Sequence, residues 1–255
     1  MNNILISLFL GSILIIFTSV LTAVAQQTVP NNNSGSSNPI VLIIVIIGLA
    51  LAPFALIMMT SFVKIAVVLS IVRNALGTQQ IPPNQVLTGI SLILTIFIMT
   101  PVVEKMRDQA GEIKNTTAVF SEVSVLELFQ ASDRAKEPLR DFLNRYAKDS
   151  DKIMFMNLAK QLAVRNGNNP DLIVENEFRV LIPSFVTSQL TEAFQIGFFL
   201  LIPFLVVDMV VSNILQAMGM VMLSPVTISL PFKLLLFVSI DGWVLLTKGL
   251  VMGYT

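Results

Sequence analysis

The sequence contains no cysteine and no histidine. Without cysteine there can be no disulfide, thiolate nucleophile, thiolate zinc site or iron–sulfur cluster. Without histidine, imidazole ligation of haem, Ser-His-Asp catalysis and histidine proton relays are excluded as well. These two absences remove most classes of enzyme.

Charge is also scarce, since only 13% of the 255 residues are charged, whereas 54% are hydrophobic and the mean hydropathy is +0.79. This composition is not that of a soluble globular protein and indicates a membrane protein. Sixteen basic residues balance sixteen acidic ones, so the net charge favours neither nucleic acid nor an anionic membrane surface as a partner.

The charges that are present gather in one segment. Residues 104–179 hold twelve of the sixteen basic and thirteen of the sixteen acidic residues. The charged residues elsewhere are Lys64, Arg73, Glu192, Asp208, Lys233, Asp241 and Lys248. Two apolar blocks therefore flank one polar insertion.

The N-terminal run "MNNILISLFLGSILIIFTSVLTAVAQQ" ends on Ala23-Val24-Ala25, which predicts a secretory signal peptide over residues 1–25, cleaved after Ala25. An uncleaved anchor is the alternative, because the run is long and no basic residue precedes it. Residues 26–39 are rich in Asn, Ser, Gly and Pro and predict a flexible leader.

Residues 40–103 predict a first hairpin of two hydrophobic spans, Ile40–Phe62 and Val86–Val103, each long enough to cross a bilayer. The helix that continues from the first span should end at Gly77, ahead of the pair Pro82-Pro83.

The polar insertion, residues 104–182, predicts a small α-helical domain, because no strand pattern occurs in it. Cleavage of the signal peptide would leave the mature N-terminus and this domain outside the cytoplasm. One helix should start at Pro138. Its apolar face would consist of Leu139, Phe142, Leu143 and Tyr146. A second helix should be capped by Ser150 or Asp151 and should end at Asn166-Gly167.

Residues 183–255 predict a second hydrophobic hairpin, with spans over Thr191–Val211 and Val226–Met252, interrupted by prolines at 203, 225 and 231. With the mature N-terminus outside, both connections between spans would lie in the cytoplasm. The predicted fold class is therefore all-α, a polytopic membrane protein of helical hairpins with a small extracytoplasmic domain.

Ionisable residues within apolar spans are costly, so each is a functional hypothesis. Asp208 and Lys233 lie near the facing ends of the last two spans and could form an intramembrane charge pair, or each could reach water at the interface. Glu192 and Asp241 are further candidate buried charges, with solvated span ends as the alternative. Ser229 and Lys233, four residues apart, would permit a Ser-Lys nucleophile pair, but Pro231 between them argues against it.

Three methionines, Met218, Met220 and Met222, alternate beside Gly219 in "LQAMGMVMLSP". Filling gaps in a core is the usual role of methionine. Alternate spacing gives no helical face, however, and a loop at membrane depth must be buried in protein or line a cavity. Several copies around one pore would form a deformable apolar gasket.

Three stretches, Thr60–Pro101, Pro183–Met220 and Ser229–Trp243, resemble the FliP/SctR family, the export-gate proteins of type III secretion. The resemblance covers nearly all of residues 60–243 and is weakest in the polar domain. The leader, together with "GTQQIPPN" where injectisome members tend to read "GVQQVPPN", favours the flagellar branch over the injectisome branch. A proton-coupled transporter is the remaining alternative, but it would need more acidic residues within the spans than this sequence has.

This resemblance implies a non-enzymatic subunit without cofactor or metal. Five copies would assemble with FliR and FliQ into a channel at the flagellar basal body in the bacterial inner membrane. FlhB and FlhA would complete the gate, and unfolded flagellar proteins would pass through it. The family's loop, commonly "MGMMM", falls on the pore gasket residues Met218, Met220, Val221 and Met222, with Val221 departing from the pattern. Asp208 and Lys233 match charged positions typical of the family.

Overall fold

A computed structural model describes residues 57–78, 81–110, 136–220 and 222–254, together with the single residues 47, 50, 54 and 134. The predicted signal peptide with its cleavage site at Ala25, the leader and most of the first predicted span lie outside the described residues. The chain divides into two compact units, Met1–Ala50 and Leu51–Thr255, and the description below concerns the second.

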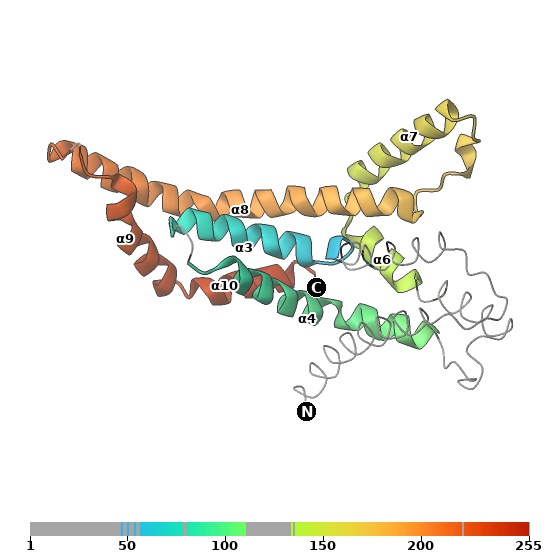
Figure 1. The fold of residues 1–255 in the computed structure, drawn as a ribbon, viewed down its shortest axis with the longest axis horizontal. Coiled ribbons are helices and arrows are strands. Elements are labelled where there is room, and N and C mark those ends of the chain that lie inside the picture. The colour runs from blue at the N-terminus through green and yellow to red at the C-terminus, as the bar shows by residue number, and fades with distance from the viewer. Residues whose placement is uncertain are drawn as a thin grey trace, which may run out of the picture. The chain divides into compact units, whose positions relative to one another are not determined.

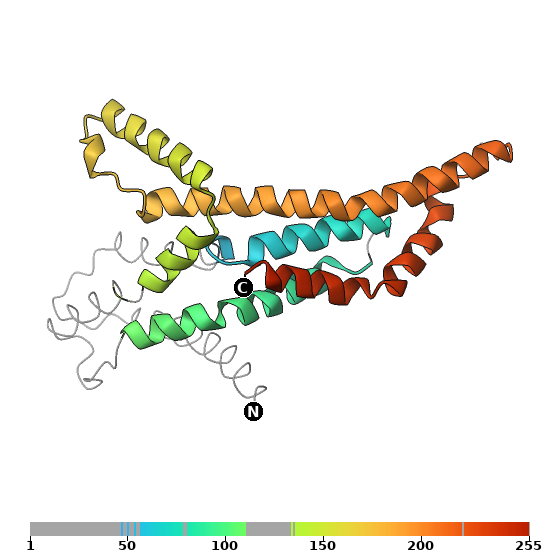
Figure 2. The same cartoon turned by 180° about the vertical axis from the view of Figure 1, so that it is seen from behind.

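Every regular element among the described residues is a helix, so the all-α fold class is confirmed. The elements are α3 (Phe62–Leu76), α4 (Asn84–Ala110), α6 (Glu137–Tyr146), α7 (Asp149–Arg165), the 3-10 turn η1 (Pro170–Leu172), α8 (Phe178–Ala217), α9 (Pro225–Ser239) and α10 (Gly242–Met252). Figures 1 and 2 show α3 lying along α8, with α4 and α10 beyond α3. One end of α8 carries α7, and α9 folds back from the other end.

Helix α3 ends where the sequence predicts. Gly77 follows its last residue with φ 76°, and the Gly77 N–H donates to the carbonyl of Asn74. This left-handed conformation costs little for glycine but is unfavourable for residues with a Cβ.

The contact between α3 and α8 requires a small residue on α8. A Cβ at Gly197 would lie 2.4 Å from Cδ1 of Ile71 and 2.9 Å from its Cγ2. Ala193, four residues earlier, is completely buried. Small residues at this spacing let two helices approach closely, which is how apolar helices associate where lipid removes the hydrophobic driving force.

Helix α8 runs for 40 residues, which corresponds to about 60 Å and is about twice the thickness of a bilayer core. The predicted span Thr191–Val211 is its central part. Pro183 and Pro203 both lie inside the helix, so the prediction that Pro203 interrupts it is wrong. A proline removes one backbone hydrogen bond, and apolar helices tolerate this where neighbouring groups satisfy the freed carbonyl.

The predicted last span, Val226–Met252, consists of two helices, α9 and α10, bent by 60°. Pro225 begins α9 as expected, but Pro231 lies within it and does not interrupt it. The break falls instead at Asp241, whose φ of 51° is left-handed. The next residue is Gly242, where a larger residue would not fit, because a Cβ there would lie 2.4 Å from the ring of Phe237.

The first helix of the polar segment packs into the core of the apolar helices. The predicted helix at Pro138 is confirmed as α6, and its Phe142 and Leu143 are buried. The Phe142 ring centroid lies 5.6 Å from that of Phe185 on α8. The following helix, α7, instead contributes to a small separate cluster with the start of α8.

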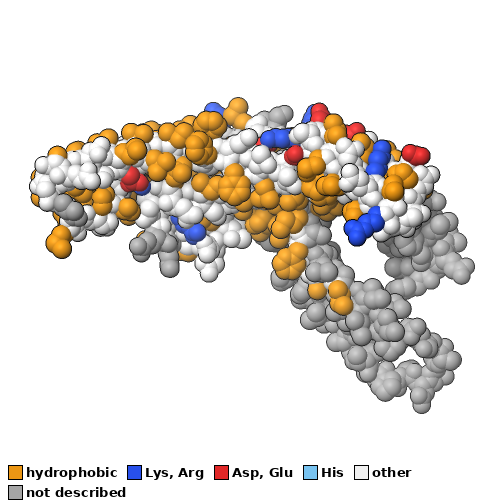
Figure 3. Space-filling model, turned by 90° about the horizontal axis from the view of Figure 1, so that it is seen from above, with side chains coloured by type: hydrophobic (Ala, Val, Ile, Leu, Met, Phe, Trp, Pro, Cys, Tyr) orange, Lys and Arg blue, Asp and Glu red, His pale blue; other side chains and the backbone are white. Residues whose placement is uncertain are grey.

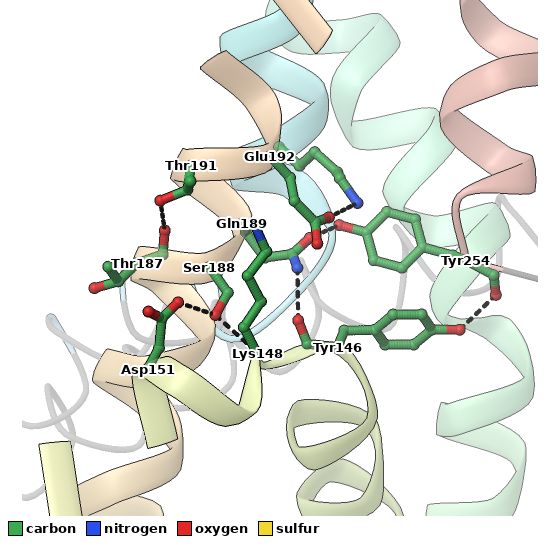
Figure 4. Close-up of polar contacts among 10 residues, drawn as sticks. Tyr146, Lys148, Asp151, Thr187, Ser188, Gln189, Thr191, Glu192 and Tyr254 are labelled. Atoms are coloured by element: carbon green, nitrogen blue, oxygen red, sulfur yellow. Dashed lines mark hydrogen bonds and ion pairs between the residues drawn. The ribbon is translucent and has the colours of Figure 1, made fainter. Parts of the chain in front are cut away.

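Helix α7 begins at Asp149 with Lys148 as its N-cap, so the prediction that Ser150 or Asp151 caps it is wrong. Ser188 of α8 makes the contacts at this end. It accepts from the Lys148 N–H at 2.9 Å and donates to the Asp151 carboxylate at 2.6 Å (Figure 4). The predicted end at Asn166-Gly167 is confirmed.

Two described helices, α4 and α8, are long and apolar enough to cross a membrane, and the bent α9–α10 pair is a third candidate. Large apolar side chains are exposed on them, including Phe97, Phe199 and Val238. In Figure 3 hydrophobic side chains extend along α8, and most of the charged ones gather towards the end that carries α7. Such a surface suits lipid or other apolar chains rather than water.

Candidate functional site

The connection from α8 to α9, residues 218–224, is called the methionine loop here. Helix α8 ends in a cap centred on Gly219, whose N–H donates to the Gln216 carbonyl at 3.0 Å. The Met220 N–H donates to the Leu215 carbonyl at 2.9 Å. This pair of bonds is a Schellman motif. Gly219 has a left-handed φ of 72°, which strains any residue with a Cβ, so glycine is favoured here although a Cβ would have free space around it.

The methionine side chains of this loop face away from the rest of the chain. Met218 is 62% exposed, Met220 is 42% exposed and Met222 is fully exposed. Val221 lies outside the described residues. These exposures argue against gap filling within this chain and leave an apolar tip between two apolar helices.

The Lys233 cluster consists of Asp208 on α8, Ser229 and Lys233 on α9, and the backbone carbonyl of Ala75 on α3. The ammonium of Lys233 lies 2.6 Å from Oδ2 of Asp208 and donates to the Ala75 carbonyl at 3.2 Å. The Ser229 hydroxyl donates to Oδ1 of Asp208. The Lys233 side chain is 4% exposed and that of Asp208 27%.

These bonds satisfy groups that would be costly to bury alone. An unpaired ammonium in a low-dielectric interior costs several kcal/mol, and the carboxylate of Asp208 offsets this cost. Ala75 lies in the last turn of α3, where carbonyls lack partners within the helix and where a cation is favoured by the helix dipole. Lys233 thereby joins α3, α8 and α9.

The same geometry bears on the Ser-Lys nucleophile hypothesis. Ser229 and Lys233 both donate to Asp208, and no hydrogen bond joins the two in the part of the chain that the structure describes. The Ser229 proton is directed to a carboxylate rather than to an amine, so the arrangement is that of a structural bridge.

The Lys233 cluster braces the two helices that carry the methionine loop. Asp208 precedes the end of α8 by nine residues, about 14 Å, and Lys233 follows the start of α9 by eight residues, about 12 Å. The ion pair therefore closes the base of a hairpin whose tip is the methionine loop.

A second polar group, the Lys64 cluster, lies at the other end of α3 (Figure 4). Its members are Lys64 on α3, Gln189 and Glu192 on α8, Tyr146 on α6 and the C-terminal Tyr254. The Lys64 ammonium lies 2.7 Å from the Glu192 carboxylate and 4.4 Å from the centroid of the Tyr254 ring. Glu192 is thus paired, with its side chain 32% exposed.

Sequence reasoning singled out Glu192 from this cluster but missed Gln189, Tyr254 and the role of Lys64. Of these three, Lys64 could have been identified from the sequence, since it is a lone charge beside an apolar span. The remaining candidate, Asp241, lies at the bend between α9 and α10 and is exposed in this chain.

One protein-family model covers the methionine loop and the Lys233 cluster. The model of the FliP family matches residues 43–250, which is most of the chain. The chain belongs to the FliP family.

Named relatives of this FliP-family chain come from two kinds of system. The flagellar biosynthetic protein FliP of Pectobacterium carotovorum subsp. carotovorum is 42% identical over 234 residues, covering 92% of this chain and 86% of its own length. The flagellar biosynthetic protein FliP of Bacillus subtilis is 43% identical over 205 residues, covering 80% and 87%. The Yop proteins translocation protein R of Yersinia pestis is 46% identical over 208 residues, covering 81% and 92%.

Proposed function

We propose that this chain is a pore-forming core subunit of the flagellar type III protein export gate, through which unfolded flagellar proteins cross the bacterial inner membrane. The observation that carries the proposal is the methionine loop, an exposed apolar tip that projects from two apolar helices joined at their base by a buried ion pair. Membership of the FliP family supports the export context.

The loop is suited to a constriction because of the chemistry of its side chains. Several copies that place this loop around one axis would form a ring of thioethers, and a narrow apolar ring excludes water and ions by dewetting. Methionine has three rotatable side-chain bonds and a polarizable sulfur, so the ring can yield to different polypeptides and close again. Val221 keeps apolar bulk but is stiffer.

In this proposal five copies assemble with FliR and FliQ, and FlhB and FlhA complete the gate at the flagellar basal body. The hairpins of residues 40–103 and 183–255 form the membrane part, and residues 104–182 lie on the periplasmic side. The exposed apolar side chains of α4, α8 and α9 offer surface for such neighbours.

The injectisome export gate is the second candidate, favoured by the 46% identity to the Yop translocation protein. The flagellar assignment is supported by the Pectobacterium alignment, whose coverage of 92% requires that it include part of the segment ahead of residue 43, where the signal peptide is predicted. Expression in a flagellated strain that lacks its own FliP tests this assignment. Restored motility supports it, and rescue of injectisome secretion alone contradicts it.

The gasket itself is tested by changing Met220 and Met222 to alanine together. Both side chains are exposed, so the change should leave the subunit folded while it widens the constriction. We expect greater ion conductance in cells that express the assembled complex, with secretion maintained. The measurement is membrane conductance alongside the amount of secreted flagellar protein.

Met209→Ala provides the control, because Met209 is also exposed, at 67%, but lies on α8 outside the loop. It should leave conductance unchanged. Unchanged conductance in the double loop variant, in complexes of normal composition, would contradict the gasket.

A further inference from the structure

The residue that follows α10 and Gly253 is buried in the protein. Tyr254, the last described residue, is 8% exposed. Its ring stacks on Phe142 with centroids 6.0 Å apart and meets the Tyr146 ring edge-on at 4.9 Å. These contacts fix the segment that follows α10 against α6.

Tyr254 also takes part in a closed cycle of three hydrogen bonds (Figure 4). Its hydroxyl donates to the side-chain oxygen of Gln189, and the Gln189 amide donates to the Tyr146 carbonyl at 2.9 Å. The Tyr146 hydroxyl in turn donates to the Tyr254 carbonyl at 2.7 Å. Each residue comes from a different part of the fold, namely the C-terminus, α8 and α6.

The ring of Tyr254 covers the Lys64–Glu192 ion pair as well. Lys64 lies 4.4 Å from the ring centroid, a distance at which an ammonium is attracted to the ring face. Burial, and after it the charge of Glu192, raises the pKa of Tyr254 above its ordinary value. The hydroxyl therefore stays protonated and serves as a donor throughout the physiological range.

Helix α10 packs against the core through one side only, where Leu246 and Leu250 join the main hydrophobic cluster. Its buried residues are Gly242, Leu246 and Leu250, and most of its remaining side chains are exposed. Helix α9, which precedes it, is fixed near its middle by Lys233. The end of the bent α9–α10 pair remote from the methionine loop is held by these apolar residues and by the contacts of Tyr254.

We propose that Tyr254 is a C-terminal latch, a positioning residue that fastens α10 to α3, α6 and α8 and so fixes the hairpin that carries one side of the methionine loop. The part of this inference that concerns the loop rests on the proposed gasket. The latch and the Lys233 cluster then hold the hairpin at two separate points, one near the loop and one at the chain end.

A double-mutant cycle tests the latch directly. Tyr254→Phe keeps the ring but removes the hydroxyl donor, and Gln189→Leu removes its acceptor. In the export complex purified from membranes, we expect each variant to lower the midpoint of thermal unfolding by about 2–4 °C, and the pair to lower it by clearly less than the sum. Thr191→Val is the matched control on α8, since the Thr191 hydroxyl donates to the Thr187 carbonyl of its own helix.

A second measurement does not depend on export. Digestion of the complex with a carboxypeptidase, followed by intact mass, should remove C-terminal residues several-fold faster from Tyr254→Phe than from the unaltered protein or from Thr191→Val. Additive midpoints, or trimming at an unchanged rate, would overturn the latch.

Ion conductance then separates the latch from the gasket. We expect Tyr254→Phe to raise conductance if both ideas hold. Suppose that carboxypeptidase digestion is faster and the unfolding midpoints are non-additive, but conductance is unchanged. That result would support the latch as an attachment of α10 and overturn its link to the loop. Unchanged conductance in the Met220 and Met222 double variant would count against the gasket alone.

Discussion

Helix α3 is held at each end by a buried lysine, but the two lysines meet it in different ways. Lys64 belongs to α3 and lies in its first turn, where the helix dipole disfavours a cation, and Glu192 together with the ring of Tyr254 compensates. Lys233 comes from α9 and meets the last turn, where the dipole favours it and where it also satisfies the Ala75 carbonyl.

The attachment of α3 to its neighbours therefore depends on charge to a different extent at its two ends. The Lys64 cluster is maintained by side chains and by three neutral hydrogen bonds around it. The Lys233 cluster joins three helices through one ammonium. We therefore expect the second cluster to be the more sensitive to loss of its lysine.

The largest effect is expected for Lys233→Met. It leaves Asp208 without its cation and Ala75 without its donor, and we expect a loss of about 3 kcal/mol, the lower end of the range for breaking a buried pair because Asp208 is partly exposed. The measurement is the amount of subunit in membranes together with secretion. Lys248→Met, at an exposed position on α10, is the control and should behave as the unaltered protein.

Exchange of the two charges sharpens this test. Asp208→Lys combined with Lys233→Asp restores an ion pair but leaves the Ala75 carbonyl without a donor, so we expect partial recovery over either single variant. A combined variant no better than the worse single one would argue against a direct pair.

A smaller effect is expected between the two lysines, at Gly197. Alanine there would bring a methyl group against Ile71, and overpacking of this kind costs about 2 kcal/mol. Ile71→Val removes the nearest of the clashing atoms, Cδ1, so it should recover part of the loss when combined with Gly197→Ala. If Gly197→Ala costs more than Lys233→Met, close packing rather than charge dominates the attachment of α3.

The smallest of these effects is expected for Lys64→Met. The change removes the cation from an unfavourable helix end, and Glu192, with a third of its side chain exposed, can be hydrated by water. We expect a loss of about 1 kcal/mol, smaller than that of Lys233→Met because the helix dipole disfavours the cation at this end and no backbone carbonyl loses its donor. The same membrane assay measures it, and a loss as large as that of Lys233→Met would remove the distinction between the two ends.

The sequence predicted two kinds of feature: helix ends set by local backbone chemistry, and charged residues that are rare in apolar surroundings. Gly77, Pro138 and the pair Asn166-Gly167 mark helix ends because their conformational preferences act on neighbouring residues. Asp208 and Lys233 drew attention as charges in apolar surroundings, and the structure places them 2.6 Å apart.

The features that the sequence did not predict depend on partners far along the chain. Ser188 of α8 replaces a local cap at α7, and Tyr254 contacts residues of α3, α6 and α8. Pro203 and Pro231 carry a strong local signal for a break, yet both lie inside helices. Tertiary packing overrides local preference at these positions.

The unbroken length of α8 gives the molecule a long lever. A rod of 40 residues, about 60 Å, that tilts by about 10° about its first turn carries its far end sideways by about 10 Å. The far end bears the Gly219 cap and the methionine side chains beyond it. Since α3 packs along α8 and Lys233 joins the two, such a tilt would carry α3 and the loop together. In the proposed gasket, a slight rearrangement where α6 and α7 pack against the start of α8 would therefore change the aperture at the other end.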